Sequence, residues 1–378
     1  MKLKMLHIVR DDKFVDGAAS LFETDSRVEN TYILIGGAKK FKYIRNTSIL
    51  FVAPDKCIDY INTFDVVVLH SLLAIPLENI KEIKSDTKVV WYAWGYDIYQ
   101  KPYDIIPIEL LGPETKKFTR YRRFGRSISI KYIRKSLYVK KHLKEALSRI
   151  DYFSGVFPYE FDLIKKYHSE FRAEPLDFYY GSDHFFIPEQ PDQVVKHGKK
   201  NIIIGNSANK TGNHLDVLKV ISGIDIDKEA KIIIPLSYNA KPYYVKQVES
   251  IAEKLAPGQV VSLRSFLPLD EYLSLISNCK TAVFAHERQQ ATDNIFMQLL
   301  YGARVYMSET SAAYTYLKKI GLNVYSLQSD LNLFNKEMSD KDIMANRVIL
   351  SSLYSSSKLI ERVKNTNTML IDKLKLGD

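Results

Sequence analysis

Residues 286–307, HERQQATDNIFMQLLYGARVYM, begin with a polar cluster that holds a cation, three amides and two carboxylates, between an apolar run and an apolar helix. Arg288 can pair with two oxygens of a diphosphate at once, because a guanidinium presents a planar fork of donors. Gln289 and Gln290 can hydrogen-bond sugar hydroxyls or an acetamido group. The alternative is an exposed polar loop in which Asp293 caps the following helix. The cluster predicts a nucleotide-sugar site if other loops lie beside it.

Three other loops in the second half also follow apolar strands. GNSANKTGNH places Gly205, Asn206 and Ser207 between a buried strand and a helix, where backbone N–H groups can hold an anion; a plain turn is the alternative. Tyr238 ends IIIPLSY and can either stack on a nucleotide base or pack internally. Glu309 follows ARVYM and can accept hydrogen bonds from ribose or stabilise a helix N-terminus. The donor-side candidates are Gly205, Asn206, Ser207, Lys210, Tyr238, Arg288, Gln289, Gln290, Asn294 and Glu309.

Polar and aromatic side chains follow strands of the first half as well. HIVRDDKFVDG comes at the first strand, and WYAWGYDIYQ ends a later one. Aromatic rings stack on sugar faces, and a carboxylate can take the proton of an acceptor hydroxyl. Asp97 is the preferred base, with helix capping as the alternative role. The catalytic candidates are Asp97, Asp16, Asp12 and Arg288, and the acceptor-binding candidates are His7, His70, Trp94 and Tyr96.

Apolar runs alternate with helical segments along the chain. Continuous runs without polar alternation, such as LKMLHIV, TYILIGG and DVVVLHS, are typical of parallel strands covered on both faces. Residues 181–200 contain Gly, two Pro and a polar tail, which indicates a linker. The sequence predicts an α/β protein with two Rossmann-like, doubly wound domains facing a cleft, at 1–180 and 201–340. A helical region at 341–378 can pack back on the first domain.

The net charge of +10 is concentrated in one segment. Residues 116–149 hold 13 Lys/Arg and one acid, and aromatic and aliphatic residues alternate with the cations. This pattern is typical of a segment lying among anionic lipid headgroups. A solvated helix face is one alternative and a nucleic-acid surface another, but no zinc-finger or RNP motif accompanies the segment. The sequence favours an anionic membrane partner over nucleic acid, with Arg122, Arg123 and Arg126 among the contacts.

Composition limits the cofactor and the compartment. Cys57 and Cys279 are too few for a disulfide framework or a zinc site, which fits a reduced cytosolic compartment. The longest uncharged run, 66–77, has 12 residues, fewer than the ~18–20 of a spanning helix. The DID at 225–227 looks like a metal-binding DxD, but it precedes a strand and so lies at the wrong end of the sheet. We therefore expect no metal and no other cofactor, and a peripheral protein at the cytoplasmic face of the inner membrane.

The segments GNS…NH, IIIPLSY, RQQ, the Glu after the next strand and WGYDIY resemble the TDP-N-acetylfucosamine:lipid II N-acetylfucosaminyltransferases, the 4-alpha-L-fucosyltransferase family. The resemblance spans most of the chain. It implies a GT-B fold with the donor in the C-terminal domain and the acceptor in the N-terminal one, and it adds His214 to the donor side. It further implies transfer of a 4-acetamido-4,6-dideoxyhexose from dTDP to a polyprenyl-diphosphate-linked saccharide in surface polysaccharide synthesis. The chain departs from the family pattern where His286 and Glu287 lengthen the loop before Arg288.

Two other functions remain open from the sequence. A sugar-nucleotide epimerase or hydrolase of the same fold would act without any lipid-linked acceptor. A non-catalytic nucleic-acid-binding protein would use residues 116–149, and its affinity would fall steeply with salt.

Overall fold

The computed structural model describes residues 2–37, 40–121, 130–177, 187–238 and 241–375. They form two compact units, which are described separately below. The first comprises Met1–Ile108, Ser127–Phe186 and Ser356–Asp378, and the second comprises Glu109–Arg126 and Ile187–Ser355.

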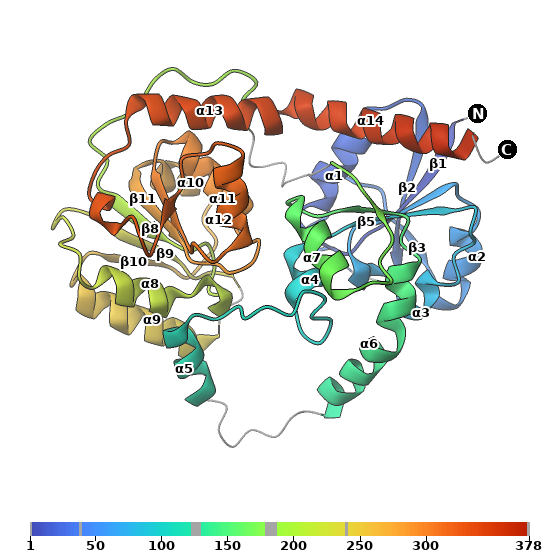
Figure 1. Ribbon diagram of the computed structural model, residues 1–378, viewed down its shortest axis with the longest axis horizontal. Coiled ribbons are helices and arrows are strands. Elements are labelled where there is room, and N and C mark those ends of the chain that lie inside the picture. The colour runs from blue at the N-terminus through green and yellow to red at the C-terminus, as the bar shows by residue number, and fades with distance from the viewer. Residues whose placement is uncertain (1, 38–39, 122–129, 178–186, 239–240, 376–378) are drawn as a thin grey trace. The chain divides into compact units, whose positions relative to one another are not determined.

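The first unit is built on a seven-stranded parallel sheet of order β3-β2-β1-β4-β5-β6-β7 (Figure 1). The strands are β1 (Leu3–Ile8), β2 (Val28–Ile35), β3 (Leu50–Val52), β4 (Val66–Leu69), β5 (Lys88–Tyr92), β6 (Tyr152–Ser154) and β7 (Glu174–Pro175). The helices are α1 (Val15–Phe22), α2 (Cys57–Ile61), α3 (Leu77–Ile80), α4 (Gly95–Tyr99), α6 (Ile130–Ser148), α7 (Tyr159–Tyr167) and α14 (Ser356–Lys375).

The last helix, α14, packs against the start of the chain. Val363 and Leu370 are buried in one cluster with Phe22 of α1 and strand residues of the sheet. Arg27 donates from Nη1 to the hydroxyl of Thr368 at 2.9 Å. Figure 1 shows α14, in red, running beside α1, in blue. Burial of this apolar face joins the C-terminal segment to the N-terminal unit.

The second unit has a six-stranded parallel sheet of order β10-β9-β8-β11-β12-β13. Its strands are β8 (Asn201–Ile204), β9 (Ile232–Pro235), β10 (Val260–Leu263), β11 (Cys279–Phe284), β12 (Arg304–Met307) and β13 (Tyr325–Ser326). Its helices are α5 (Pro113–Tyr121), α8 (His214–Ile221), α9 (Pro242–Leu255), α10 (Leu269–Ser277), α11 (Thr292–Leu300), α12 (Ala312–Lys319) and α13 (Asp340–Tyr354). Short 3₁₀ turns occur in the first unit at Pro54–Lys56 and Leu72–Ala74, and in the second unit at Lys210–Gly212 and Leu331–Leu333.

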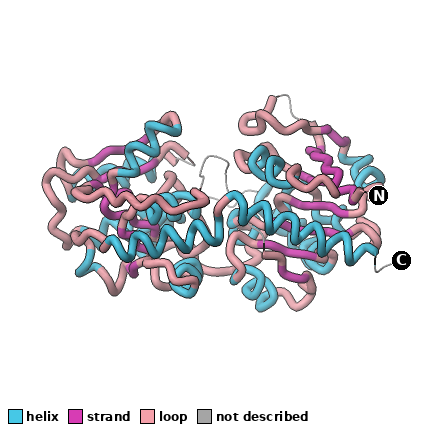
Figure 2. The backbone as a smooth tube through the Cα atoms, turned by 90° about the horizontal axis from the view of Figure 1, so that it is seen from above, coloured by secondary structure: helices cyan, strands magenta, loops and turns pink. Residues whose placement is uncertain are grey.

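Both sheets are doubly wound, as the continuous apolar runs predict. The residues of β4, β8 (after its first residue) and β9 are buried, because helices cover both faces of each sheet. In the tube view of Figure 2, the strands in magenta lie between helices in cyan. The strand order reverses between β1 and β4 in the first unit and between β8 and β11 in the second. In doubly wound sheets, ligands bind at such a switch point, at the carboxyl ends of the strands.

Some boundaries differ from those expected. The strand predicted at 176–180 is found at β7, two residues earlier, and residues 178–180 lie outside the described part. The sequence pattern missed β13, which has only two residues. The basic segment 116–149 is divided between the units, since α5 belongs to the second and α6 to the first. The expected linker at 181–200 is described only from residue 187.

Candidate active site

The loop after β8 holds a buried imidazole against two glycines. Gly205 follows β8 with φ +68°, a left-handed conformation that favours glycine. A Cβ at Gly205 would lie 2.7 Å from Nε2 of His214, and one at Gly212 would lie 2.7 Å from Cε1 of the same ring. Burial lowers the pKa of His214 to about 4, and its Nδ1 meets the Tyr244 hydroxyl at 3.2 Å. Gly205 is therefore required for the position of His214 as well as for the turn.

Gln290 joins the loop after β11 to the loop after β8. Its Oε1 accepts from the hydroxyl of Thr211 at 2.7 Å, and its Nε2 donates to Oδ1 of Asn206 at 3.3 Å. Asn213 makes a second link, from Nδ2 to the carbonyl of Ala285 at 2.8 Å. Two donor-side candidates, Asn206 and Gln290, thus lie in contact although they are 84 positions apart in the chain.

Arg288 and Gln289 form the turn that leads into α11. The half-buried Arg288 donates from Nη1 to the carbonyl of Gln289 at 2.8 Å. The amide of Gln289 is buried and donates to the hydroxyl of Thr292 at 2.9 Å. Ala291 closes the turn with φ +61°. Gln289 is thus engaged with the first turn of α11, so a hydrogen bond from its amide to a sugar would require a different side-chain conformation.

Glu309 presents an exposed carboxylate after β12. Its Oε2 accepts from the hydroxyls of Ser326 at 2.6 Å and Ser329 at 2.7 Å. These hydrogen bonds hold the pKa of Glu309 below its ordinary value, so the side chain is ionised near neutral pH. An anchored, ionised carboxylate at this edge of the sheet is suited to accept hydrogen bonds from hydroxyl groups.

The other donor-side candidates have structural partners or surface positions. Ser207 is buried, and its hydroxyl faces the backbone N–H of Asn209 at 3.5 Å. Lys210 begins the short 3₁₀ turn that precedes α8. Asn294, on α11, accepts a hydrogen bond from the hydroxyl of Tyr272.

Two features of these loops were missed in the sequence. Glu287 accepts from the hydroxyls of Ser308 at 2.7 Å and Thr310 at 2.8 Å, which ties the loop after β11 to the loop after β12. Phe266 follows β10 and is 69% exposed, with its ring 6.5 Å from that of Tyr238, which is 47% exposed. The rule that identified Tyr238, an aromatic residue after a strand, applies equally to Phe266.

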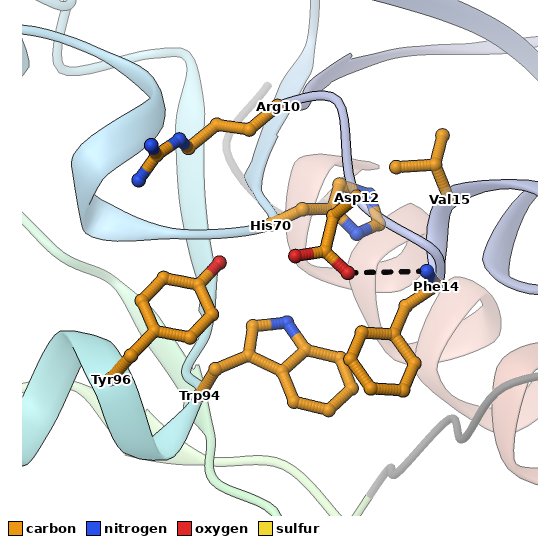
Figure 3. Close-up of a pocket in the computed structure, with 7 residues that line it drawn as sticks. All are labelled: Arg10, Asp12, Phe14, Val15, His70, Trp94 and Tyr96. Carbon is orange, nitrogen blue, oxygen red and sulfur yellow. Dashed lines mark hydrogen bonds between the residues drawn. The ribbon is translucent and has the colours of Figure 1, made fainter. Parts of the chain in front are cut away.

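A pocket lies at the carboxyl ends of β1, β4 and β5 in the first unit (Figure 3). Its lining residues are Arg10, Asp12, Phe14, Val15, His70, Trp94 and Tyr96. Trp94 stacks on Phe14, with ring centroids 4.2 Å apart and planes 15° apart. Figure 3 shows the carboxylate of Asp12 above the Trp94 indole, between Tyr96 and Phe14. Four of the sequence-predicted residues, Asp12, His70, Trp94 and Tyr96, are therefore brought together.

Asp12 supplies the carboxylate of this pocket. Its Oδ1 accepts from the backbone N–H of Phe14 at 3.3 Å. Burial raises the pKa of Asp12, against the opposing effects of the Phe14 amide and of the charges on Lys13 and Arg10. A carboxylate with a raised pKa, beside an aromatic face, can take a proton from a bound hydroxyl group.

Asp97, the base preferred from the sequence, does not line the pocket. Its side chain is 0% exposed and accepts from the hydroxyl of Ser71 at 2.6 Å and from the backbone N–H groups of Leu72 and Trp94 at 3.2 and 3.4 Å. The indole N–H of Trp91 lies 3.4 Å from the same carboxylate. Burial raises the pKa of Asp97 to about 7, although these donors favour the ionised form. These contacts match the alternative role, a carboxylate that caps α4.

Asp16 has a similar structural position. Its oxygens accept from the backbone N–H groups of Arg45 at 2.8 Å and Asn46 at 3.2 Å. They also accept from the backbone N–H of Thr47 at 2.9 Å and its hydroxyl at 2.6 Å. Burial acts to raise the pKa of Asp16, but the hydroxyl and the amides outweigh it and the pKa is lowered. Asp16 anchors the segment before β3, and it is not among the residues that line the pocket.

His7 reaches the pocket only through His70. Nδ1 of His7 and Nε2 of His70 are 2.9 Å apart, and Nε2 of His7 is 3.0 Å from Oδ1 of Asn30. The amide of Asn30 donates from Nδ2 to the carbonyl of Phe22 at 3.3 Å, which turns Oδ1 towards His7. Burial lowers the pKa of His7 to about 4 and that of His70 well below its ordinary value. Both rings are therefore neutral near pH 7.

Within the described ranges, no group of three or more His, Cys, Asp or Glu is placed to hold a metal ion. The acids at 225–227 come before β9, at the amino end of its sheet, as the sequence suggests. The carbonyl of Asp225 accepts from the amide of Asn335 at 2.8 Å. These acids are thus distant from the loops at the carboxyl ends.

The 4-alpha-L-fucosyltransferase family, glycosyl transferase group 56, matches this chain over residues 155–346. The match covers just over half of the sequence and includes every donor-side candidate. The chain belongs to this family. The resemblance found in the loop motifs is confirmed, and this group 56 chain is a glycosyltransferase.

Solved structures agree with the family on the fold. The group 56 chain is similar to the Anabaena protein HepE, in a structure with UDP and glucose, at 12% identity and a TM-score of 0.62, covering 97% of this chain and 100% of that one. It is similar to the lipopolysaccharide outer core galactosyltransferase WaaB at 9% identity and a TM-score of 0.61, and the match covers 97% of this chain and 98% of that one. It is also similar to a glycosyltransferase from Rickettsia africae at 11% identity and a TM-score of 0.62, and the match covers 98% of this chain and 99% of that one. These likenesses confirm the GT-B fold class.

The basic segment of the group 56 chain has an exposed amphipathic part. In α6, the C-terminal half buries Val139 and Leu143 and the helix packs against α3. Its N-terminal half instead exposes apolar side chains beside cations: Ile130, Lys131, Tyr132, Ile133, Arg134, Lys135 and Leu137. The predicted contacts Arg122, Arg123 and Arg126 lie outside the described residues. No helix in the described part of the chain is long and apolar enough to cross a bilayer.

Proposed function

We propose that this glycosyltransferase moves a 4-acetamido-4,6-dideoxyhexose from a dTDP carrier to a polyprenyl-diphosphate-linked saccharide at the cytoplasmic face of the inner membrane. Family membership supports the choice of donor and acceptor. The observation that carries the proposal is the pair of loops at the switch point of the second unit, joined through Gln290. On the same edge of that sheet, Arg288 supplies a cation for the diphosphate, and Glu309 supplies an acceptor for a hydroxyl group of the nucleoside.

The donor assignment follows from the chemistry of these loops. Arg288 is suited to the two phosphates, because a guanidinium can bind two oxygens at once. Glu309 is held as a carboxylate by Ser326 and Ser329, and it is suited to accept a hydrogen bond from the 3′-hydroxyl of the deoxyribose in dTDP. The exposed rings of Tyr238 and Phe266 offer flat apolar surface to a nucleotide base. We therefore assign the second unit to the nucleotide sugar.

The acceptor assignment rests on the pocket of the first unit. The Trp94–Phe14 stack offers an aromatic face to a sugar ring, and Asp12 lies beside it. In the transfer step, the acceptor oxygen forms a bond to the anomeric carbon and the bond from that carbon to the phosphate oxygen breaks. The electron pair of the broken bond stays on the phosphate, and the hydroxyl proton passes to Asp12. We assign this proton to Asp12 rather than Asp97, because the oxygens of Asp97 are buried and already accept several hydrogen bonds.

Membrane attachment rests on α6. Its exposed Ile133 and Leu137 can insert among acyl chains while Lys131, Arg134 and Lys135 meet anionic headgroups. Each such cation contributes about 1 kcal/mol near an anionic surface, and the contribution falls with salt. A lipid-linked acceptor would be held at the same surface.

Thermal unfolding of the full chain with dTDP, UDP, GDP or CMP tests the donor assignment. A ligand that binds the folded state at about 100 times its Kd adds about 2.7 kcal/mol to the free energy of unfolding. We expect dTDP to raise the melting temperature most. UDP is the main competitor, since the similar Anabaena structure contains it. No shift with any nucleoside diphosphate would refute the donor site, and conversion of the nucleotide sugar without an acceptor would favour an epimerase or hydrolase.

A further inference from the structure

His286 is a buried histidine that none of the assigned roles uses. It lies directly beyond β11, at the switch point of the second sheet, and its ring is 2% exposed. The ring stacks on Phe284, with centroids 6.2 Å apart. Among the residues that the structure describes, neither Nδ1 nor Nε2 finds a hydrogen-bond partner. An apolar ring of this shape would pack equally well without leaving two polar atoms unmet.

His214 follows the neighbouring strand, β8, and adds a third ring nitrogen that meets no hydrogen-bond partner among the described residues. It is the first residue of α8, it is 0% exposed, and its Nε2 has no partner within the described part of the chain. Burial lowers the pKa of His286 well below its ordinary value, and the proximity of Arg288 and His214 lowers it further. Each ring is therefore neutral and carries one N–H and one lone pair.

This edge of the sheet holds the ring N–H groups of His286 and His214, the guanidinium of Arg288 and the N-terminus of α8. Such a set of donors and positive charge favours an anion over a neutral ligand. Unmet polar groups that persist in a folded protein often mark a functional site, because binding supplies the missing partners. Gly205, in the loop before α8, lies against the His214 ring. A phosphate group has the oxygens that these nitrogens need.

We propose that His286 hydrogen-bonds the diphosphate of the nucleotide carrier through a ring N–H, with His214 as a second donor from the first turn of α8. This inference rests on the proposed function and deepens it. When the bond between sugar and phosphate breaks, negative charge builds up on the phosphate oxygen. The N–H of His286 and the guanidinium of Arg288 stabilise that charge. His286 transfers no proton in this step, since the acceptor proton passes to Asp12.

The test compares His286→Phe with the wild type, using calorimetric titration with dTDP and the melting temperature of the full chain. We expect dTDP affinity to fall about 10–100-fold, the effect of losing one hydrogen bond to a charged group. We expect the melting temperature to stay level or rise by a few degrees, because two unmet polar atoms are removed. A histidine needed only for the fold would give the opposite pattern, with a lower melting temperature and unchanged affinity of the folded protein.

Two further variants make the result decisive. His286→Gln keeps an N–H donor and should recover part of the affinity. Gln298→Met is the matched control, because Gln298 is a fully buried polar residue of α11 whose Oε1 also lacks a partner among the described residues. It lies near the C-terminal end of that helix, so the control should leave dTDP affinity unchanged.

The outcomes separate this inference from the proposed function. If the wild type binds no nucleoside diphosphate, the donor site itself is wrong, and the role of His286 falls with it. If the wild type binds dTDP and His286→Phe binds it equally well, the inference about His286 is overturned and the donor site stands. A loss of affinity that comes with a lower melting temperature and no recovery in His286→Gln also overturns it.

Discussion

Gly205→Ala should destabilise the second unit through two effects that can be measured separately. Alanine at φ +68° carries the strain of a left-handed backbone, about 1 kcal/mol. Its Cβ would also lie 2.7 Å from Nε2 of His214, closer than carbon tolerates, so the buried ring must move. Overpacking of this kind costs about 1–3 kcal/mol. The free energy of unfolding should therefore fall by about 2–4 kcal/mol in total.

Gly258→Ala is the matched control for the backbone effect. Gly258 has φ +72°, and a Cβ there would meet nothing within 4 Å. We expect it to cost about 1 kcal/mol or less, or about 2–4 °C in melting temperature, since Ala also restricts the unfolded chain. Both substitutions lie in the second unit, so the same unfolding transition reports on them.

The contact with His214 is isolated by repeating Gly205→Ala in a His214→Ala background. Removal of the ring should reduce the cost of the glycine substitution to that of the Gly258 control, a coupling of about 1–3 kcal/mol. Thermal melts followed by circular dichroism, with hydrogen exchange of residues 201–222, measure both costs. Equal costs for Gly205→Ala and Gly258→Ala in the wild-type background would refute the argument that the glycine makes room for the ring.

Three other predictions concern Asp12, Asp97 and the basic segment. Asp12→Asn should lower kcat by about 10²–10⁴ with dTDP affinity unchanged, and a normal rate of transfer in that variant would exclude Asp12 as the base. Burial raises the pKa of Asp97 from 3.8 to about 7, so its contribution to stability is fully present below about pH 4 and is lost as the pH rises towards 7. Urea unfolding should show the wild type losing on the order of 3 kcal/mol relative to Asp97→Asn over that range, whereas parallel profiles would contradict a protonated Asp97. Charge reversal at Arg122, Arg123 and Arg126 should release the protein from anionic vesicles at low salt, and unchanged co-sedimentation would count against the membrane surface.

The sequence predicts the two doubly wound sheets because their strands are continuous apolar runs. Such runs identify β1, β4, β8 and β11, and the carboxyl-end rule then points to the loops that follow them. Local pattern also gives the helices that flank these strands. It does not give β13, because two residues are too few to form a periodic pattern.

The choice between Asp12 and Asp97 could not be made from the sequence. Both acids follow strands, and what separates them is the set of donors that each one meets. Ser71 reaches Asp97 from 26 positions away, and this contact exists only once β4 and β5 are paired. The same limit applies to His286, whose lack of partners becomes visible only when its surroundings are packed. Residue type and spacing identify candidate groups, whereas burial and long-range partners decide their roles.

The chain of contacts from Asn30 through His7 to His70 sets a direction for every proton along it. The amide oxygen of Asn30 can only accept, so Nε2 of His7 must carry the hydrogen, and Nδ1 of that neutral ring is left to accept. Nε2 of His70 must then be the donor of the next link, which leaves the lone pair of His70 on Nδ1. A single backbone carbonyl, that of Phe22, thus fixes the tautomer of a residue in the pocket wall by orienting one amide. Any group that meets Nδ1 of His70 must therefore donate the hydrogen, because that ring nitrogen can only accept.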